Sequence, residues 1–123
     1  MKADFDTLKA VKIWTNPSPT AAFAAGKLSI AGSSAYTLLV IVFAVDLNTS
    51  NRHVTTVLSK VPNGDTVSAF MMPANANMTA YSRAVYRAGD DLYFTVANKK
   101  DITSTSRTED NTTLVPIEIY GIV

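Results

Sequence analysis

Residues 35–46 constrain this chain more than any other segment. They form a run dominated by β-branched and aromatic side chains, with no charge until Asp46. Such a segment cannot stay solvated, so we expect a long strand buried on both faces, at the centre of a packed β-structure or of a subunit interface. Its uncharged part is about half as long as a helix that crosses a bilayer. A membrane span is therefore not expected.

Length and composition set the remaining bounds. The 123 residues suit one domain, 1–123, with an extended N-terminal segment 1–8. Charged residues make up 17%, below the roughly 25% of an ordinary soluble domain, which hints that partner chains cover some apolar surface. The net charge is +1 and the basic residues are scattered, so we expect no nucleic-acid binding. The absence of cysteine excludes disulfides and thiolate metal sites. The N-terminus lacks the apolar stretch of a secretory signal.

Short apolar segments alternate with turn clusters along the whole chain, at a spacing typical of sandwiches and barrels. We expect strands at 8–14, 28–30, 35–46, 53–60, 66–72, 79–87, 92–97 and 113–122. About eight strands and no helix of useful length predict an all-β fold, an antiparallel, jelly-roll-like β-sandwich.

Three local features refine this expectation. The pair Asn63-Gly64 favours the positive φ values of a tight turn and predicts a hairpin in which 54–61 pairs with 66–72. Pro116 lacks an N–H and should mark an edge strand or a bulge. The polar segment 98–111 is expected to be a long exposed loop or a mobile arm.

Reactive constellations are absent from the sequence. His53 is the single histidine and has no serine nucleophile motif beside it. Asp90 and Asp91 are adjacent, so on a strand they would point to opposite faces and could not flank a sugar; a turn is the better interpretation. The loop 46–51 offers one carboxylate, too few for a calcium site. There is no phosphate-binding or dinucleotide motif. We therefore expect no enzyme, no cofactor and no metal site.

Contact surfaces suit the remaining residues better than reactions do. Trp14, Tyr81, Arg83, Arg87 and Tyr93 belong to the residue types enriched at binding hot spots, and sugars also stack on exposed aromatic rings. These five are our candidate interface or ligand contacts. Two alternatives stay open: most aromatic residues in a small β-domain are core, and the two arginines on one strand face could simply be solvated.

Two stretches carry a resemblance to a known group of proteins. The first is Trp14-Thr-Asn-Pro-Ser-Pro-Thr20, followed by Phe23-Ala-Ala, and the second is Val115-Pro-Ile-Glu-Ile-Tyr-Gly-Ile122. In these the chain resembles small virion proteins of bacteriophages and prophages of Gram-positive bacteria. The resemblance implies a β-sandwich module on the tail tip, a fibre or the capsid surface, without catalytic residues. Glu118 and the length of 98–111 depart from the pattern.

The leading hypothesis is a bacteriophage virion structural protein, a tail- or fibre-associated module for assembly and host adsorption. The resemblance implies a homotrimer that contacts other virion proteins and host-surface polysaccharide, assembled in the bacterial cytoplasm and located in the virion. The alternatives are a capsid decoration or head-fibre protein and a free-standing carbohydrate-binding module, with a small hydrolase a distant third.

The central run supplies a test of assembly. If its odd-numbered residues from Leu39 to Phe43 face the core while its even-numbered residues from Leu38 to Val42 are exposed on the isolated chain, the second face is an assembly surface.

Overall fold

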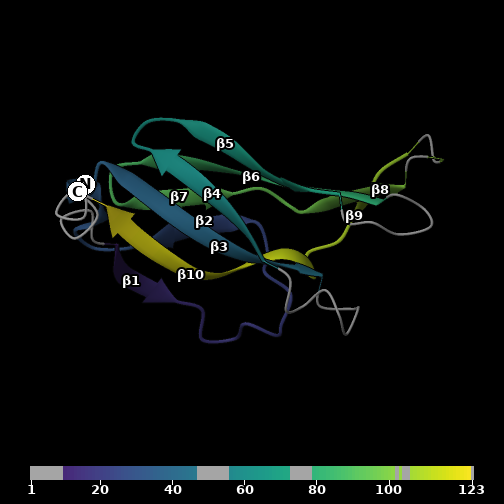
Figure 1. Cartoon of the computed structure of the whole chain (residues 1–123), viewed down its shortest axis with the longest axis horizontal. Coiled ribbons are helices and arrows are strands. Elements are labelled where there is room, and N and C mark those ends of the chain that lie inside the picture. Colours follow the sequence, from purple (N-terminus) through teal and green to yellow (C-terminus); the bar gives the residue numbers. More distant parts are fainter. Residues whose placement is uncertain (1–9, 47–55, 73–78, 102, 104–105, 123) are drawn as a thin grey trace, which may run out of the picture.

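The chain folds into two antiparallel β-sheets packed face to face (Figure 1). The structure, a computed structural model, describes residues 10–46, 56–72, 79–101, 103 and 106–122. This arrangement confirms the predicted all-β sandwich, with ten strands in the described residues instead of about eight.

The first sheet has four strands in the order β1-β10-β3-β4. They are β1 (Val11–Thr15), β10 (Thr113–Ile122), β3 (Leu38–Asp46) and β4 (Thr56–Pro62). The long strands β10 and β3 lie at its centre and pair over almost their whole length, from Thr113 opposite Asp46 to Ile122 opposite Leu38.

The second sheet has six strands in the order β2-β7-β6-β8-β9, with β5 paired along the other edge of β6. They are β2 (Gly26–Ser29), β7 (Asp91–Phe94), β6 (Thr79–Ala88), β8 (Asn98–Asp101), β9 (Thr108–Glu109) and β5 (Thr66–Met71). A short 3-10 turn, η1 (Ser33–Ala35), precedes β3.

The core lies between the sheets and is centred on β3. Its odd-numbered residues from Leu39 to Val45 are 0% exposed, whereas the even-numbered residues from Leu38 to Val42 are half-buried. In a two-layer sandwich only one face of a sheet meets the other sheet, and the alternation of side chains divides the strand accordingly. The predicted burial on both faces is thus complete on the inner face and partial on the outer one.

The predicted hairpin between 54–61 and 66–72 is wrong. Asn63 and Gly64 do form a turn, and Gly64 has the expected positive φ of 83°, but β4 pairs with β3 and β5 pairs with β6. The turn therefore carries the chain from one sheet to the other. Turn residues set the local backbone, while the choice of partner strand is made by the packing of the two sheets.

Pro116 lies in the middle of a sheet, because β10 is flanked by β1 and β3. The expectation of an edge strand is wrong for this residue, and that of a bulge is confirmed. The pairing of β10 with β3 shifts register between Pro116 and Glu118. An extra residue at this point accommodates the missing N–H without interrupting the rest of the strand.

In its described part, 98–101, 103 and 106–111, the polar segment 98–111 contains strands that were not predicted. It contains β8 and β9, which pair through Asn98 with Glu109 and Lys99 with Thr108. A salt bridge of 3.0 Å joins Lys99 Nζ to Asp110 Oδ2. The expectation of a loop or a mobile arm is wrong here, because a short hairpin can be polar on both faces when it extends a sheet.

Candidate functional site

Arg87 is buried between the two sheets and is bonded to backbone carbonyl groups. Its Nη2 donates to the carbonyl oxygens of Ser33, at 3.0 Å, and Tyr36, at 2.6 Å. Its Nη1 donates to those of Val61, at 3.1 Å, and Thr37, at 3.4 Å. Burial lowers its pKa below the ordinary value for arginine. The side chain therefore ties β6 to η1, to the start of β3 and to β4.

Arg83 is also buried, at 1% exposure, and has fewer partners. Its Nη2 donates to Asn111 Oδ1 at 3.1 Å, and its guanidinium carbon lies 5.6 Å from the ring centroid of Phe23. Its Nε and Nη1 have no hydrogen-bond partner among the described residues. Burial lowers the pKa of Arg83 to about 10.

Neither arginine can contact a partner in the isolated chain, because both side chains are buried. For the same reason, the alternative that the two arginines form a solvated face is wrong. Tyr81, Arg83, Val85 and Arg87 share one face of β6, as predicted, but that face turns inward and each residue is at most 2% exposed. Both guanidinium groups therefore belong to the interior of the fold.

Tyr81 and Trp14 also lie inward. Tyr81 is 2% exposed and belongs to the core cluster. The half-buried Trp14 ring meets Phe23 edge-on, with centroids 6.3 Å apart, and Phe23 meets Phe94 in the same way at 5.2 Å. These rings link β1 to β7 across the sandwich. Tyr81 and Trp14 therefore follow the alternative that aromatic residues of a small β-domain pack in its interior.

Tyr93 is the one of the five candidates that is largely exposed. It lies on the outer face of the six-stranded sheet, 42% exposed, beside Tyr86, which is also 42% exposed. Their ring centroids are 6.0 Å apart and their planes differ by 29°. The pair is an aromatic surface that needs both strands, β6 and β7.

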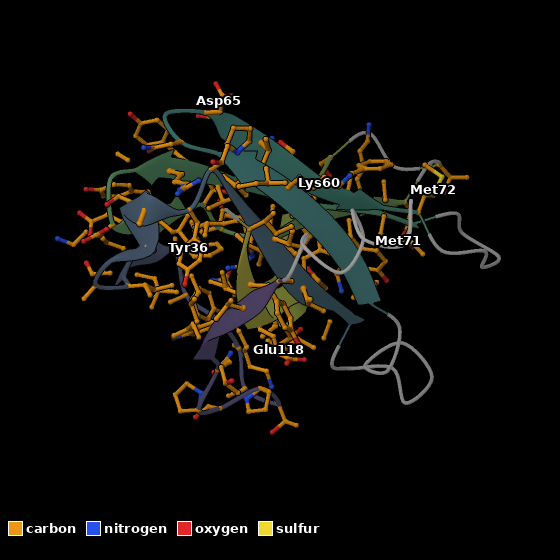
Figure 2. The ribbon with its side chains drawn as sticks, turned by 60° about the vertical axis from the view of Figure 1, so that its left-hand side comes forward. Tyr36, Lys60, Asp65, Met71, Met72 and Glu118 are labelled. Carbon is orange, nitrogen blue, oxygen red and sulfur yellow. The ribbon has the colours of Figure 1, made fainter. Side chains whose placement is uncertain are left out.

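The outer face of the four-stranded sheet is apolar over much of its area. We call it the outer β3 face; its half-buried apolar residues are Leu38, Val40, Val42, Tyr120 and Ile122. Figure 2 shows the two charged residues Lys60 and Glu118 on either side of β3, on the flanking strands β4 and β10.

A small polar network borders this face. Lys12 Nζ lies 3.0 Å from Glu118 Oε2, and the Tyr120 hydroxyl donates to the same oxygen at 2.8 Å. These hydrogen bonds, chiefly the one from Lys12, lower the pKa of Glu118, and the bond to Glu118 raises the pKa of Lys12. Glu118 is therefore an ionised carboxylate with two partners.

A groove of about 390 Å³ lies next to that network. Its lining residues include Pro19, Thr20, Ala44, Ile117 and Glu118. Glu118 is the one carboxylate among the lining residues. A second acid, which hydrolysis of a glycoside would require, is absent from this lining.

The acidic residues considered for catalysis have structural partners. Asp90 accepts hydrogen bonds from the backbone N–H groups of Ser34, at 2.8 Å, and Gly32, at 3.2 Å, which lower its pKa. Asp91 accepts one from the Ser29 hydroxyl at 2.5 Å. Within the described ranges no group of three metal-ligating residues comes together. His53 and the loop 47–51 lie outside the described residues, and so does the side chain of Asp46.

The two stretches that carry the phage resemblance are neighbours in space, since β1 pairs with β10 (Figure 1). Asn16 is buried between them: its Nδ2 donates to the Pro116 carbonyl at 2.8 Å and its backbone N–H to that of Ile117 at 2.9 Å. Its Oδ1 accepts from the Ser18 N–H at 2.7 Å. The first stretch thus holds β1 and its following loop against β10.

Comparisons with known proteins add no identity. No protein-family model, no curated protein and no solved structure matches the chain. In the part of the chain that the structure describes, no helix has the length and apolar character of a membrane span. The fold and these surfaces define the class as an antiparallel β-sandwich domain.

The five candidate contact residues do not include Tyr86 and Lys12. Tyr86 is of the same binding-prone residue type as Tyr93, and the cross-strand register makes the two a surface pair. The face of β6 that carries no arginine is lined by alanine and serine. This pattern of small residues could have indicated that the face is exposed, and its tyrosine with it. No sequence signal predicted that Lys12 would meet Glu118, because the two are far apart along the chain.

Proposed function

We propose that this chain is a non-catalytic structural module of a bacteriophage virion, which assembles with copies of itself as a homotrimer at a tail or fibre and contributes to host adsorption. One observation carries the assembly part: the central strands of the four-stranded sheet present apolar side chains to the outside as well as to the core. The virion part is supported by the two stretches that resemble phage proteins.

The occupant we assign to the outer β3 face is a second copy of this chain. Leu38, Val40 and Val42 form its middle, while Lys12 with Glu118 and, on the other side, Lys60 border it. An apolar centre with a polar rim is the usual anatomy of a protein interface. Because Lys12 and Glu118 pair within the chain, the rim carries little uncompensated charge against another copy.

The size of this face is at the lower end of what association needs. Its strands β1, β10, β3 and β4 have 5, 10, 9 and 7 residues. At about 4.8 Å between strands and about 3.3 Å per residue they present roughly 490 Å². Two such faces bury roughly 1,000 Å², about the area that a specific interface needs. In a threefold assembly each face is shared between two neighbours.

A capsid decoration protein would use the same assembly face, so the position of the module on the particle is a separate question. Localising the chain on purified virions with a gold-labelled antibody would answer it. Label at the tail or fibre supports the proposed position, and label over the capsid contradicts it.

Sedimentation velocity at micromolar concentration tests the assembly. We expect the wild-type chain to be a trimer and Leu38→Glu to be a monomer, because Leu38 pairs with Ile122 and Pro62, and a carboxylate buried there at the interface would have no cation opposite it. The matched control is Phe70→Glu, which places the same charge at an apolar residue, 57% exposed, on the other sheet. It should remain a trimer.

Circular dichroism of each variant shows whether the sandwich is intact. A wild-type chain that is monomeric at micromolar concentration contradicts the proposal. So does a folded Leu38→Glu variant that remains a trimer.

A further inference from the structure

We propose that the outer face of the six-stranded sheet binds a neutral polysaccharide, with Tyr86 and Tyr93 as its stacking platform. The inference deepens the proposed function and rests on it in one respect: with the outer β3 face covered by other copies, this opposite face is the one left exposed.

The platform is built by strand register. Tyr86 on β6 pairs with Tyr93 on β7, and on their far sides Tyr86 pairs with Thr66 and Tyr93 with Lys27. The two rings, 6.0 Å apart, are thus at the centre of a row of four side chains that crosses β5, β6, β7 and β2. Four paired strands hold the row, so it is a rigid element and not a loop.

The neighbouring row leaves the rings uncovered. It contains Ser68, Ala84 and Thr95, of which Ser68 pairs with Ala84 and the Thr95 hydroxyl accepts from the Ala84 N–H at 3.0 Å. These short side chains lie low on the sheet, so the longer tyrosines stand above them, which agrees with the 42% exposure of each ring residue. A flat ligand can lie on this low row against the rings.

The chemistry of the row indicates a sugar. A pyranose with equatorial hydroxyl groups has flat faces of C–H groups that pack on an aromatic ring, while its hydroxyls point outward to polar partners. Tyrosine combines an apolar ring with a polar tip, and Thr66, Ser68 and Lys27 add donors and acceptors beside the rings. A few placed polar groups around an apolar platform are what fixes a ligand in orientation.

The charge near the platform indicates that the ligand is neutral. Lys27 is in the row itself, Asp91 lies in the next one, where it accepts from Ser29 at 2.5 Å, and the exposed Asp65 directly precedes Thr66. One cation and two anions provide no field that would attract a polyanion. A neutral chain of β-linked pyranosides, such as glucose or N-acetylglucosamine, therefore fits better than an acidic polymer.

Isothermal titration calorimetry tests the site with two probes, the β-1,4-linked hexasaccharides of glucose and of N-acetylglucosamine. We expect the wild-type chain to bind at least one, and Tyr93→Ala and Tyr86→Ala to weaken that binding about tenfold or more. Tyr93→Phe keeps the ring and should lose much less affinity. No binding of either probe by the wild-type chain would overturn the inference.

Phe70→Ala is the matched control, since Phe70 is an exposed aromatic residue on the same face that pairs with Ser82 and has no aromatic neighbour across the strand. Its affinity should equal that of the wild-type chain. An equal loss in Phe70→Ala and Tyr93→Ala would mean that the face binds sugars without a platform, and would overturn the inference.

Two readouts separate this site from the assembly. Sedimentation velocity on the same samples reports the oligomer: a trimer that binds neither hexasaccharide overturns the polysaccharide site alone, and a monomer that binds one overturns the assembly alone. Binding to purified Gram-positive cell walls provides the second readout. Competition by the hexasaccharide supports the site, whereas binding that resists it and is lost after protease treatment of the walls points to a protein receptor and overturns it.

Discussion

Arg87 and Arg83 lie four residues apart on the same face of β6 and are both buried, yet their surroundings differ. Arg87 donates to four backbone carbonyl oxygens and leaves its Nε without a partner among the described residues. Arg83 donates to one side-chain oxygen, that of Asn111, and leaves Nε and Nη1 without partners among the described residues. Neither guanidinium forms a salt bridge within the described part of the chain.

The difference shows that burial by itself does not say what an arginine contributes. Backbone carbonyls can replace the hydration of a buried cation when several converge, as they do where η1, β3 and β4 meet Arg87. Where fewer acceptors converge, as at Arg83, more of the desolvation penalty stays uncompensated, although burial lowers the pKa of both arginines. We expect Arg87 to stabilise the fold and Arg83 to cost stability.

The largest effect is expected from Arg87→Met. The variant removes the charge and leaves the carbonyl groups of Ser33, Tyr36 and Val61 without their donor. The free energy of unfolding should fall by about 3–5 kcal/mol. Urea denaturation followed by circular dichroism measures it, and a loss below that of Arg83→Met would reverse the comparison.

Gly121→Ala should have the second largest effect, because it reaches the Arg87 network through Tyr36. A Cβ at Gly121 would lie 2.5 Å from the Tyr36 ring, and the Tyr36 carbonyl accepts from Arg87. We expect a loss of about 1–3 kcal/mol. If the clash is the cause, the loss should largely disappear in a Tyr36→Ala background; a loss of the same size there would exclude it.

Arg83→Met should raise the free energy of unfolding slightly, by about 1 kcal/mol or less. The substitution gives up one hydrogen bond to Asn111 and the contact with Phe23, and it removes a buried cation with two unpartnered nitrogens. The same urea titration measures it. A loss as large as that of Arg87→Met would show that Arg83 has further partners.

Arg83 also adds a pH dependence to the free energy of unfolding. Its pKa is about 10 in the folded chain, below the ordinary value for arginine. Between these two values the unfolded chain binds more protons, so the wild-type chain gains stability relative to Arg83→Met as pH rises through 10. The slope approaches about 1.4 kcal/mol per pH unit. Urea titrations at about pH 9 and about pH 11 check it; a constant difference between the two proteins would contradict the lowered pKa.

Much of the fold could be predicted from the sequence, and less of the candidate surface. The strand at 113–122 and the inner face of β3 agree with the pattern, because the alternation of apolar residues reports strands directly. Tyr93 was identified by residue type, but its partner Tyr86 became evident only from the register of β6 and β7. Arg83 and Arg87 were placed on one face correctly, and that face turned out to be the inner one.

The sequence by itself determined that this chain is an all-β sandwich, since residues 35–46 must be buried and the rest alternates and turns like strands. The tertiary structure decided which strands pair and which face of β6 points inward. The physical reason is that a period of two fixes the residues that share a face but not its direction. The four carbonyl groups that accept hydrogen bonds from Arg87 come from residues 26 to 54 positions away in the sequence. Only folding brings them to one place.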